Sequence, residues 1–192
     1  MKGTLAVTND PEANELLNAD PLALLLGMLL DQQVPMEWAF LAPYKLKDRL
    51  GGSLDATQIA ALGPEKVEEI FRDKPALHRF PGSMGKRAHA VCQHLVDHYG
   101  GRAEALWSGD VDGAELLRRL KELPGFGDEK SMIFIALLAK RMGVQPQGWE
   151  QAAGPFADPE PRSVADIDSK ESFARVREWK QAKKKAGQTK QD

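Results

Sequence analysis

The chain has 192 residues and a mass of 21.2 kDa, which suffices for one sizeable core or two small helical lobes. With 42% hydrophobic and 28% charged residues, it lacks the low hydrophobicity and high net charge of a disordered chain. A single cysteine, Cys92, excludes an intramolecular disulfide, an all-cysteine zinc site and a cysteine-ligated iron–sulfur cluster. No apolar run reaches the roughly 18 residues of a membrane span, and the N-terminus lacks the apolar region of a signal peptide. We therefore expect a cytoplasmic protein that does not associate with membranes.

Charge is distributed unevenly along the chain. The net charge is −2, but residues 170–190 contain eight lysine or arginine residues and two glutamates, so this arm carries +6 and the remainder −8. A basic arm on an acidic body indicates a polyanionic partner, whereas a solvated helix end has the same composition. Charge alone leaves both interpretations open.

Helical periodicity extends over most of the chain, and no segment alternates apolar and polar residues as a strand does. Asp10 and Asp20 each precede a proline, an arrangement typical of an N-cap followed by proline at the first helical position. The third helix contains Pro43, which we expect to bend it. The helices expected before residue 145 span residues 11–18, 21–32, 35–50, 55–62, 64–72, 83–99, 110–120 and 128–142. The sequence therefore predicts an all-α fold.

Glycine and proline interrupt residues 143–162, leaving at most a short turn near Trp149. Asp168 then looks like the N-cap of a last helix, whose apolar edge predicts packing on the rest of the chain. That edge consists of Phe173, Val176 and Trp179. We divide the chain into a helical domain at 1–145, a Gly/Pro-rich loop at 146–167, and a basic helix and tail at 168–192.

The most informative segment comprises residues 116–142, in which Leu-Pro-Gly-Phe-Gly at 123–127 separates two predicted helices. Two glycines around one apolar residue allow a sharp turn and let backbone amides approach an external group. The next helix begins at once, so its free N–H groups and the positive end of its dipole face the same point, which suits a phosphate oxygen. A simple bend between packed helices is the alternative interpretation.

Three motifs in chain order match a known family. Residues 123–131 resemble the helix–hairpin–helix DNA-binding motif, and Leu-Leu-Asp-Gln-Gln-Val at 29–34 resembles a segment that follows an apolar helix in the helix–hairpin–helix (HhH-GPD) DNA glycosylase superfamily. Residues 80–88 are similar to the family segment that leads into a Lys-Ala-containing helix. The resemblance covers about residues 20–145. It implies two helical lobes with the hairpin motif beside a DNA-binding cleft, and base excision, in which a flipped-out base is cut from its sugar.

The resemblance also implies roles for individual residues. The hairpin would bind a DNA phosphate, a lysine after it would contact the backbone, and a glutamine would enter the duplex or face the unpaired base. These DNA-binding residues are Gly125, Phe126, Gly127, Lys130, Gln32 and Gln33. A polar helix end for the glutamines and a solvated lysine remain the alternatives. The family's turn often holds a monovalent cation through backbone carbonyls, which points to Leu123 and Gly125.

One departure from the family concerns strand cleavage. Members that cleave the strand carry a Schiff-base lysine at the seventh residue of the Leu-Pro-Gly motif, where this chain has Glu129. Lys130 follows one residue later, rotated by about 100° on the helix. We therefore expect no lyase activity. The four-cysteine cluster of endonuclease III-like members is missing, and we expect no cofactor other than a cation at the hairpin.

A second departure concerns the catalytic acid. Most members carry an aspartate about 24 residues after the motif's leucine, where it stabilises an oxocarbenium-like transition state; here that position is Gln147, which carries no charge. An active enzyme then needs a displaced carboxylate, and the candidates are Asp166, Asp31 and Glu150. Asp166 precedes the last helix, Asp31 adjoins the glutamines, and Glu150 follows Gln147 closely. One family branch specialised for alkylated adenine also lacks the usual aspartate.

Two further groups have side chains suited to binding. Trp149 lies in the Gly/Pro-rich segment, where its ring would stack on a flipped base or simply pack in the core. His94 and His98 are spaced i, i+4 as metal ligands often are, but no third ligand is evident and we expect no zinc.

The leading hypothesis is a monofunctional DNA N-glycosylase that acts on a damaged or mismatched base in double-stranded DNA in the nucleoid. The alternative is a non-catalytic protein of the same fold that binds distorted or damaged DNA. No sequence feature indicates a protein partner.

Overall fold

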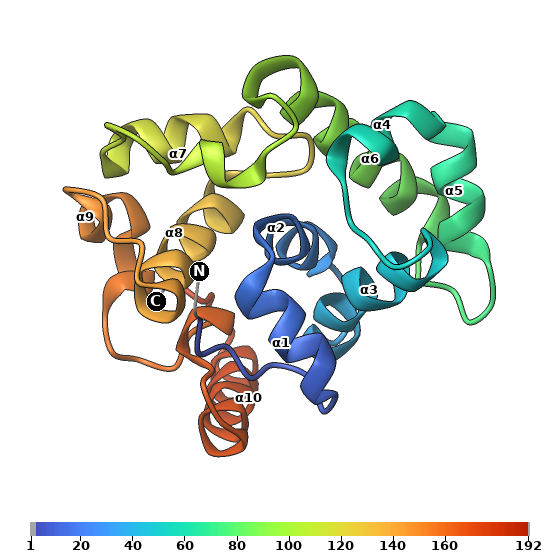
Figure 1. The fold of residues 1–192 in the computed structure, drawn as a ribbon. Helices are drawn as coiled ribbons and strands as arrows, with labels where there is room; N and C mark the ends of the chain where they lie inside the picture. The colour runs from blue at the N-terminus through green and yellow to red at the C-terminus, as the bar shows by residue number, and fades with distance from the viewer. Residues whose placement is uncertain (1–2, 192) are drawn as a thin grey trace.

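The computed structural model describes residues 3–191 and contains α-helices and short 3-10 helices, with no strand in this range (Figure 1). This confirms the predicted all-α class. The elements are α1 (Pro11–Ala19), α2 (Pro21–Leu30), α3 (Met36–Arg49), α4 (Ala56–Leu62), α5 (Pro64–Arg72), α6 (Pro81–Tyr99), η1 (Ala103–Leu106), α7 (Gly113–Lys121), α8 (Asp128–Met142), α9 (Trp149–Ala153), η2 (Gly154–Ala157), η3 (Val164–Asp166) and α10 (Lys170–Lys185).

Capping residues explain where several helices begin. Asp10 and Asp20 accept hydrogen bonds from backbone N–H groups in the first turns of α1 and α2, as predicted. The predicted cap Asp168 is wrong, because Ser169 caps α10 through a reciprocal pair with Ser172. The Asp168 carboxylate instead forms an ion pair with Arg141 at 2.5 Å, so tertiary contact outweighs its local capping tendency.

The helices form two lobes, one built from α1–α6 and the other from α7–α10 (Figure 1). Within the first lobe, α4, α5 and α6 pack on one another, and α2 lies between these three helices and the second lobe. All residues of α2 from 22 to 30 are buried, because this apolar helix contributes to one continuous core. No single helix among residues 3–191 is long and apolar enough to cross a membrane, and α1 and α2 meet that test only as a pair bent by 112°.

Residues 146–167 are more regular than the sequence indicated. They include α9, which packs on α7 and α8, and η3, which packs on α8. The N–H of Gly113 donates to the carbonyl of Gln147 at 2.8 Å, and Ser163 forms a capping box with Asp166. Burial of Phe156 and Ala165 adds apolar contact, so tertiary packing orders a segment whose glycines and prolines predict irregular chain.

The C-terminal helix joins both lobes. Val176 of α10 is buried, and Arg177 pairs with Glu37 of α3 at 3.5 Å. Arg162, in the segment before η3, places its guanidinium 5.3 Å from the ring centre of Trp179. Helix α10 therefore connects the first turn of α3 with the segment around η3 in its own lobe.

The close approach of α7 to residues 147–149 gives a stability prediction. A Cβ at Gly113 would lie 2.5 Å from the carbonyl oxygen of Gly148, which is backbone and cannot rotate away. We expect Gly113→Ala to lower the free energy of unfolding by about 1–3 kcal/mol, measured by urea denaturation. Gly127→Ala is the control, because a Cβ there meets no atom within 4 Å. Equal stability of the two variants would contradict this packing.

Candidate nucleic-acid interface

The predicted hairpin forms a tight turn whose geometry depends on its own residues. Gly125 has φ +87°, and the N–H of Phe126 donates to the carbonyl of Leu123 at 3.0 Å. The Phe126 ring is buried edge-on against Phe134 of α8, with ring centres 6.1 Å apart. The apolar residue between the two glycines therefore anchors the turn, and the glycines provide its shape.

The start of α8 is open to an external acceptor. Its N-cap, Gly127, is exposed and has no side chain to bond the first-turn N–H groups. Two acidic side chains follow, and each pairs with a lysine: Asp128 with Lys121 at 2.5 Å and Glu129 with Lys190 at 2.9 Å. These ion pairs reduce the repulsion that the carboxylates would exert on a phosphate at this helix end.

The two lobes meet where the hairpin contacts the end of α2. Lys130 Nζ donates to the carbonyl of Leu29 at 2.6 Å, which satisfies one of the last carbonyls of α2. A Cβ on Gly125 would lie 2.9 Å from Leu29 Cδ1 and 3.4 Å from Arg87 Cδ. We call this junction the seam, and it comprises residues 29–33, Arg87, residues 123–130 and Lys180.

The two glutamines occupy different positions at the seam. Gln32 Oε1 accepts a hydrogen bond from Arg87 of α6 at 2.9 Å, so its side chain is tied to the first lobe. Gln33 is exposed and has φ +58°, a left-handed conformation that no other non-glycine residue in 3–191 adopts. Sequence reasoning did not single out Arg87, although it lies within the family-like segment at 80–88.

Exposed aromatic rings flank the end of α2. Trp38 and Phe80 are 36% and 43% exposed, and the buried ring of His78 lies between them, with ring centres 6.4 and 6.1 Å away. His78 Nε2 is 3.1 Å from the carbonyl of Leu30, so this ring joins the loop before α6 to α2. Burial lowers the pKa of His78. The seam therefore has apolar, stackable surface beside it.

Two lysines from different helices are attracted by the charge of Asp31. Burial lowers the pKa of Lys130 to about 8, and the opposing attraction of Asp31 is the largest charge effect on it. Burial also lowers the pKa of Lys180, and Asp31 is again the strongest charge acting on it. Asp31 is the C-cap residue of α2, and its carboxylate makes no hydrogen bond or ion pair with residues 3–191. The seam thus holds an unbonded carboxylate near two partly desolvated ammonium groups.

Asp166 is engaged in local structure. Its Oδ1 accepts from Lys140 Nζ at 2.7 Å and its Oδ2 accepts from the N–H of Ser163 at 3.0 Å. The Asp166 side chain is 9% exposed and the Lys140 side chain 13%. Both carboxylate oxygens therefore have partners that order η3 and attach it to α8.

Glu150, Gln147 and Trp149 lie away from the seam. Glu150 and Gln147 are exposed and line a depression between α7 and α9, and Trp149 is partly buried against the core. Helix α8 separates α9 from α2 in Figure 1, and α9 packs on α7 and α8. The structure therefore brings Asp31 together with the hairpin, but not these three residues.

The basic arm and the hairpin share one face. A depression of about 550 Å³ is lined by Glu129 of α8 together with α10 and the tail. Its basic lining residues are Lys180, Lys183, Lys184 and Lys190. Positive charge from the arm thus continues to the first turn of α8.

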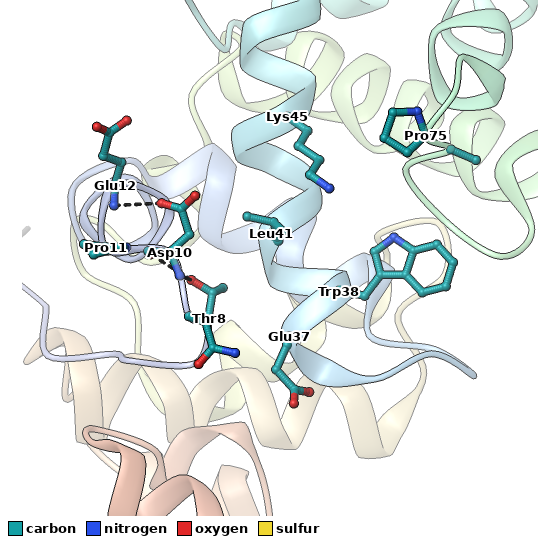
Figure 2. Close-up of a pocket in the computed structure, with 11 residues that line it drawn as sticks. Thr8, Asp10, Pro11, Glu12, Glu37, Trp38, Leu41, Lys45 and Pro75 are labelled. Atoms are coloured by element: carbon teal, nitrogen blue, oxygen red, sulfur yellow. Dashed lines mark hydrogen bonds between the residues drawn. The ribbon is translucent and has the colours of Figure 1, made fainter.

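A larger depression, of about 910 Å³, lies between α1, α3 and the loop before α6 (Figure 2). Figure 2 shows Trp38, Leu41 and Lys45 of α3 along this depression, with Glu12 and Glu37 at its edges. Three carboxylates, those of Asp10 and these two glutamates, outnumber the single lysine in its lining. This negative balance disfavours a phosphate backbone, so the seam is the better nucleic-acid interface.

Comparison with protein families agrees with this geometry. The family model described as HhH-GPD superfamily base excision DNA repair protein matches residues 26–192. The chain therefore belongs to the HhH-GPD superfamily of base excision DNA repair proteins, a membership that implies DNA binding. Searches of curated proteins and of solved structures return no match.

The lowered pKa of Lys130 predicts a pH-dependent stability. Between the folded pKa of about 8 and the ordinary value of 10.5, the unfolded chain binds more protons at this lysine than the folded chain does. The contribution of Lys130 to the free energy of unfolding should therefore rise with pH in this window. We measure the free energy of unfolding of the parent protein and of Lys130→Met by urea denaturation. The parent value minus the variant value should rise from pH 7.5 to pH 10. Lys184→Met, at an exposed position of α10, controls for loss of one charge. A pH-independent difference would contradict burial of the Lys130 ammonium.

Proposed function

We propose that this protein is a monofunctional DNA N-glycosylase that removes a damaged or mismatched base from double-stranded DNA. The observation that carries the proposal is the unbonded Asp31 carboxylate, which lies at the seam beside the hairpin. Cleaving the glycosidic bond builds positive charge on the sugar, and a carboxylate in a partly desolvated site stabilises that charge.

Asp31 is favoured over the other carboxylates because of its surroundings. Both oxygens of Asp166 already accept hydrogen bonds, and Glu150 is exposed beside α7. Asp31 follows α2 directly and adjoins Gln32 and Gln33, which by the family resemblance would enter the duplex or face the unpaired base. We assign two roles to the Asp31 carboxylate: it stabilises the sugar cation, and it accepts a proton from the attacking water.

The remaining seam residues hold the DNA. The first-turn amides of α8, at the exposed Gly127, bind a phosphate, and the basic arm extends this contact along the backbone. Gln33, exposed and held in a left-handed conformation, enters the duplex, whereas Gln32 orients Arg87. Of the two carbonyls suggested for a monovalent cation at the hairpin, that of Gly125 is the better ligand. It accepts no hydrogen bond from residues 3–191, whereas the carbonyl of Leu123 already accepts one.

Absence of strand cleavage is also part of the proposal. Glu129, at the lyase position, pairs with Lys190, and the Lys130 amine is bonded to the Leu29 carbonyl. A lowered pKa is a property of amine nucleophiles, but this amine also joins the two lobes, so reaction with an abasic sugar would break that contact.

Removing the charge of Asp31 tests the catalytic assignment. We expect Asp31→Asn to lower single-turnover excision by about 10²-fold or more, because the amide keeps the shape but not the charge. DNA affinity, measured by fluorescence anisotropy, should change little. Asp166→Asn is the matched control: it should lower stability through loss of the Lys140 pair and leave excision by the folded fraction unchanged.

This pair of variants also separates the two functions considered for the chain. Unchanged excision by Asp31→Asn would contradict the role of Asp31. If the parent protein excises no base from duplexes with uracil, alkylated, oxidised or mismatched bases but binds them preferentially, the non-catalytic alternative is correct.

Replacing Gly127 tests the hairpin as a phosphate site. A methyl group there meets no protein atom, so Gly127→Ala should preserve the fold and obstruct an incoming phosphate. We expect about a tenfold weaker affinity for every duplex, with affinity of the parent protein falling steeply as salt rises. Gly125→Ala is a poorer probe, because its positive φ and its contact with Leu29 would disturb the fold.

Ala61→Ser, which also adds one heavy atom at an exposed position, on α4, is the control and should bind DNA as the parent does. Affinity that is insensitive to both salt and Gly127→Ala would exclude the hairpin as the phosphate site.

A further inference from the structure

Lys180 occupies a position where packing alone would favour an apolar side chain. It follows Phe173 and Val176 at helical spacing, and these two residues form the inward edge of α10. Burial of an ammonium group costs free energy unless acceptors compensate it. A methionine or leucine at position 180 would avoid that cost, so the lysine requires another explanation.

The ammonium of Lys180 has a weak protein partner. Its Nζ lies 3.0 Å from the sulfur of Met36, and no carboxylate or carbonyl of residues 3–191 accepts a hydrogen bond from it. A lysine ammonium has three donors, and a thioether is a weak acceptor. At least two N–H groups are therefore available to a ligand at the seam.

The charges around this ammonium come from four elements. Asp31 at the end of α2, Glu129 of α8 and Asp166 of η3 attract it, and Lys190 of the tail repels it. Asp31 has the largest effect of these charges. Because Asp31 makes no hydrogen bond or ion pair with residues 3–191, the seam presents a cation and an unpaired carboxylate from different helices.

We propose that Lys180 is the general acid of the glycosylase, donating a proton to the departing base while Asp31 faces the sugar. The inference rests on the proposed function. The bond between C1′ and the base nitrogen breaks, its electron pair stays on the base, and the Lys180 ammonium protonates that base. Water adds to C1′ and gives its proton to Asp31. Transfer of that proton from Asp31 to the neutral Lys180 amine restores both groups.

The surroundings of Lys180 suit this role. Burial lowers its pKa from the usual 10.5, so the ammonium is a stronger acid than that of a solvated lysine. General acid catalysis matters most for a base that would otherwise leave as an anion. The substrate class is therefore a neutral damaged or mismatched base, rather than an N-alkylated base such as 7-methylguanine, which carries a positive charge and leaves as a neutral molecule.

Leaving-group dependence tests the assignment. Single-turnover excision is measured for Lys180→Met on matched duplexes, one carrying a neutral lesion that the parent excises and the other carrying 7-methylguanine. We expect a loss of about 10²-fold or more for the neutral base. Any excision of 7-methylguanine should change by less than about threefold, since no proton is needed. Lys184→Met removes a charge from the exposed face of α10 and should affect both duplexes by the same factor.

A second variant distinguishes proton donation from charge alone. Arginine keeps a cation at this position but does not release a proton near neutral pH. Lys180→Arg should therefore leave excision of the neutral base impaired. Full restoration by arginine would show that only charge is required, and equal losses on both duplexes would assign Lys180 a structural role; either result overturns the proposal.

The outcomes also separate this inference from the proposed function. A parent protein that excises only the cationic base remains a glycosylase but refutes the acid role of Lys180. A parent protein that excises no base refutes both. Thermal unfolding of Lys180→Met confirms that the comparison uses folded protein, and its midpoint should not fall, because an apolar side chain replaces a desolvated cation.

Discussion

The hydrogen bond from Lys130 to the Leu29 carbonyl determines how the hairpin sits against the rest of the protein. It joins the first turn of α8 to the last turn of α2 at 2.6 Å, over 101 positions of sequence. Because α2 is buried along residues 22–30, its end is a rigid reference for the second lobe. Gly125 lets the turn approach Leu29 closely, and the open N-terminus of α8 is thereby placed beside Asp31, Gln32 and Arg87.

Much of the fold could be predicted because its signals are local. Proline after aspartate located the starts of α1 and α2, and the bounds of α5 and α8 follow directly from Pro64 and from the hairpin glycines. Residues 146–167 could not be predicted in the same way. Their order depends on α7 and α8, through contacts such as Gly113 to Gln147 and Lys140 to Asp166, and sequence separation hides these pairs.

The candidate site was predictable only in part, for the same reason. The hairpin and the glutamines have recognisable residue patterns, and the structure places them at one seam. Arg87 and Lys180 have no such pattern: each is a basic residue on a helix rich in polar positions. What distinguishes them is tertiary environment: Arg87 reaches Gln32 because α6 packs on α2, and Lys180 is desolvated and feels the charge of Asp31 because α10 packs on the first turn of α3. The position expected for a catalytic acid, Gln147, lies with α9 instead.

The two desolvated lysines at the seam have a cost for the stability of the folded protein. Lys130 and Lys180 are both desolvated, and each has a lowered pKa despite the attraction of Asp31. Neither is compensated by a bonded carboxylate, so the folded state carries an electrostatic cost that apolar residues would remove. For Lys130 that cost is offset by the contact that joins the lobes. For Lys180 no comparable hydrogen bond is made with residues 3–191, and in the proposed function it is DNA that supplies acceptor atoms to this ammonium. The basic arm therefore does more than add positive charge to the surface, since its inward face places Lys180 between Met36 of α3 and the first turn of α8.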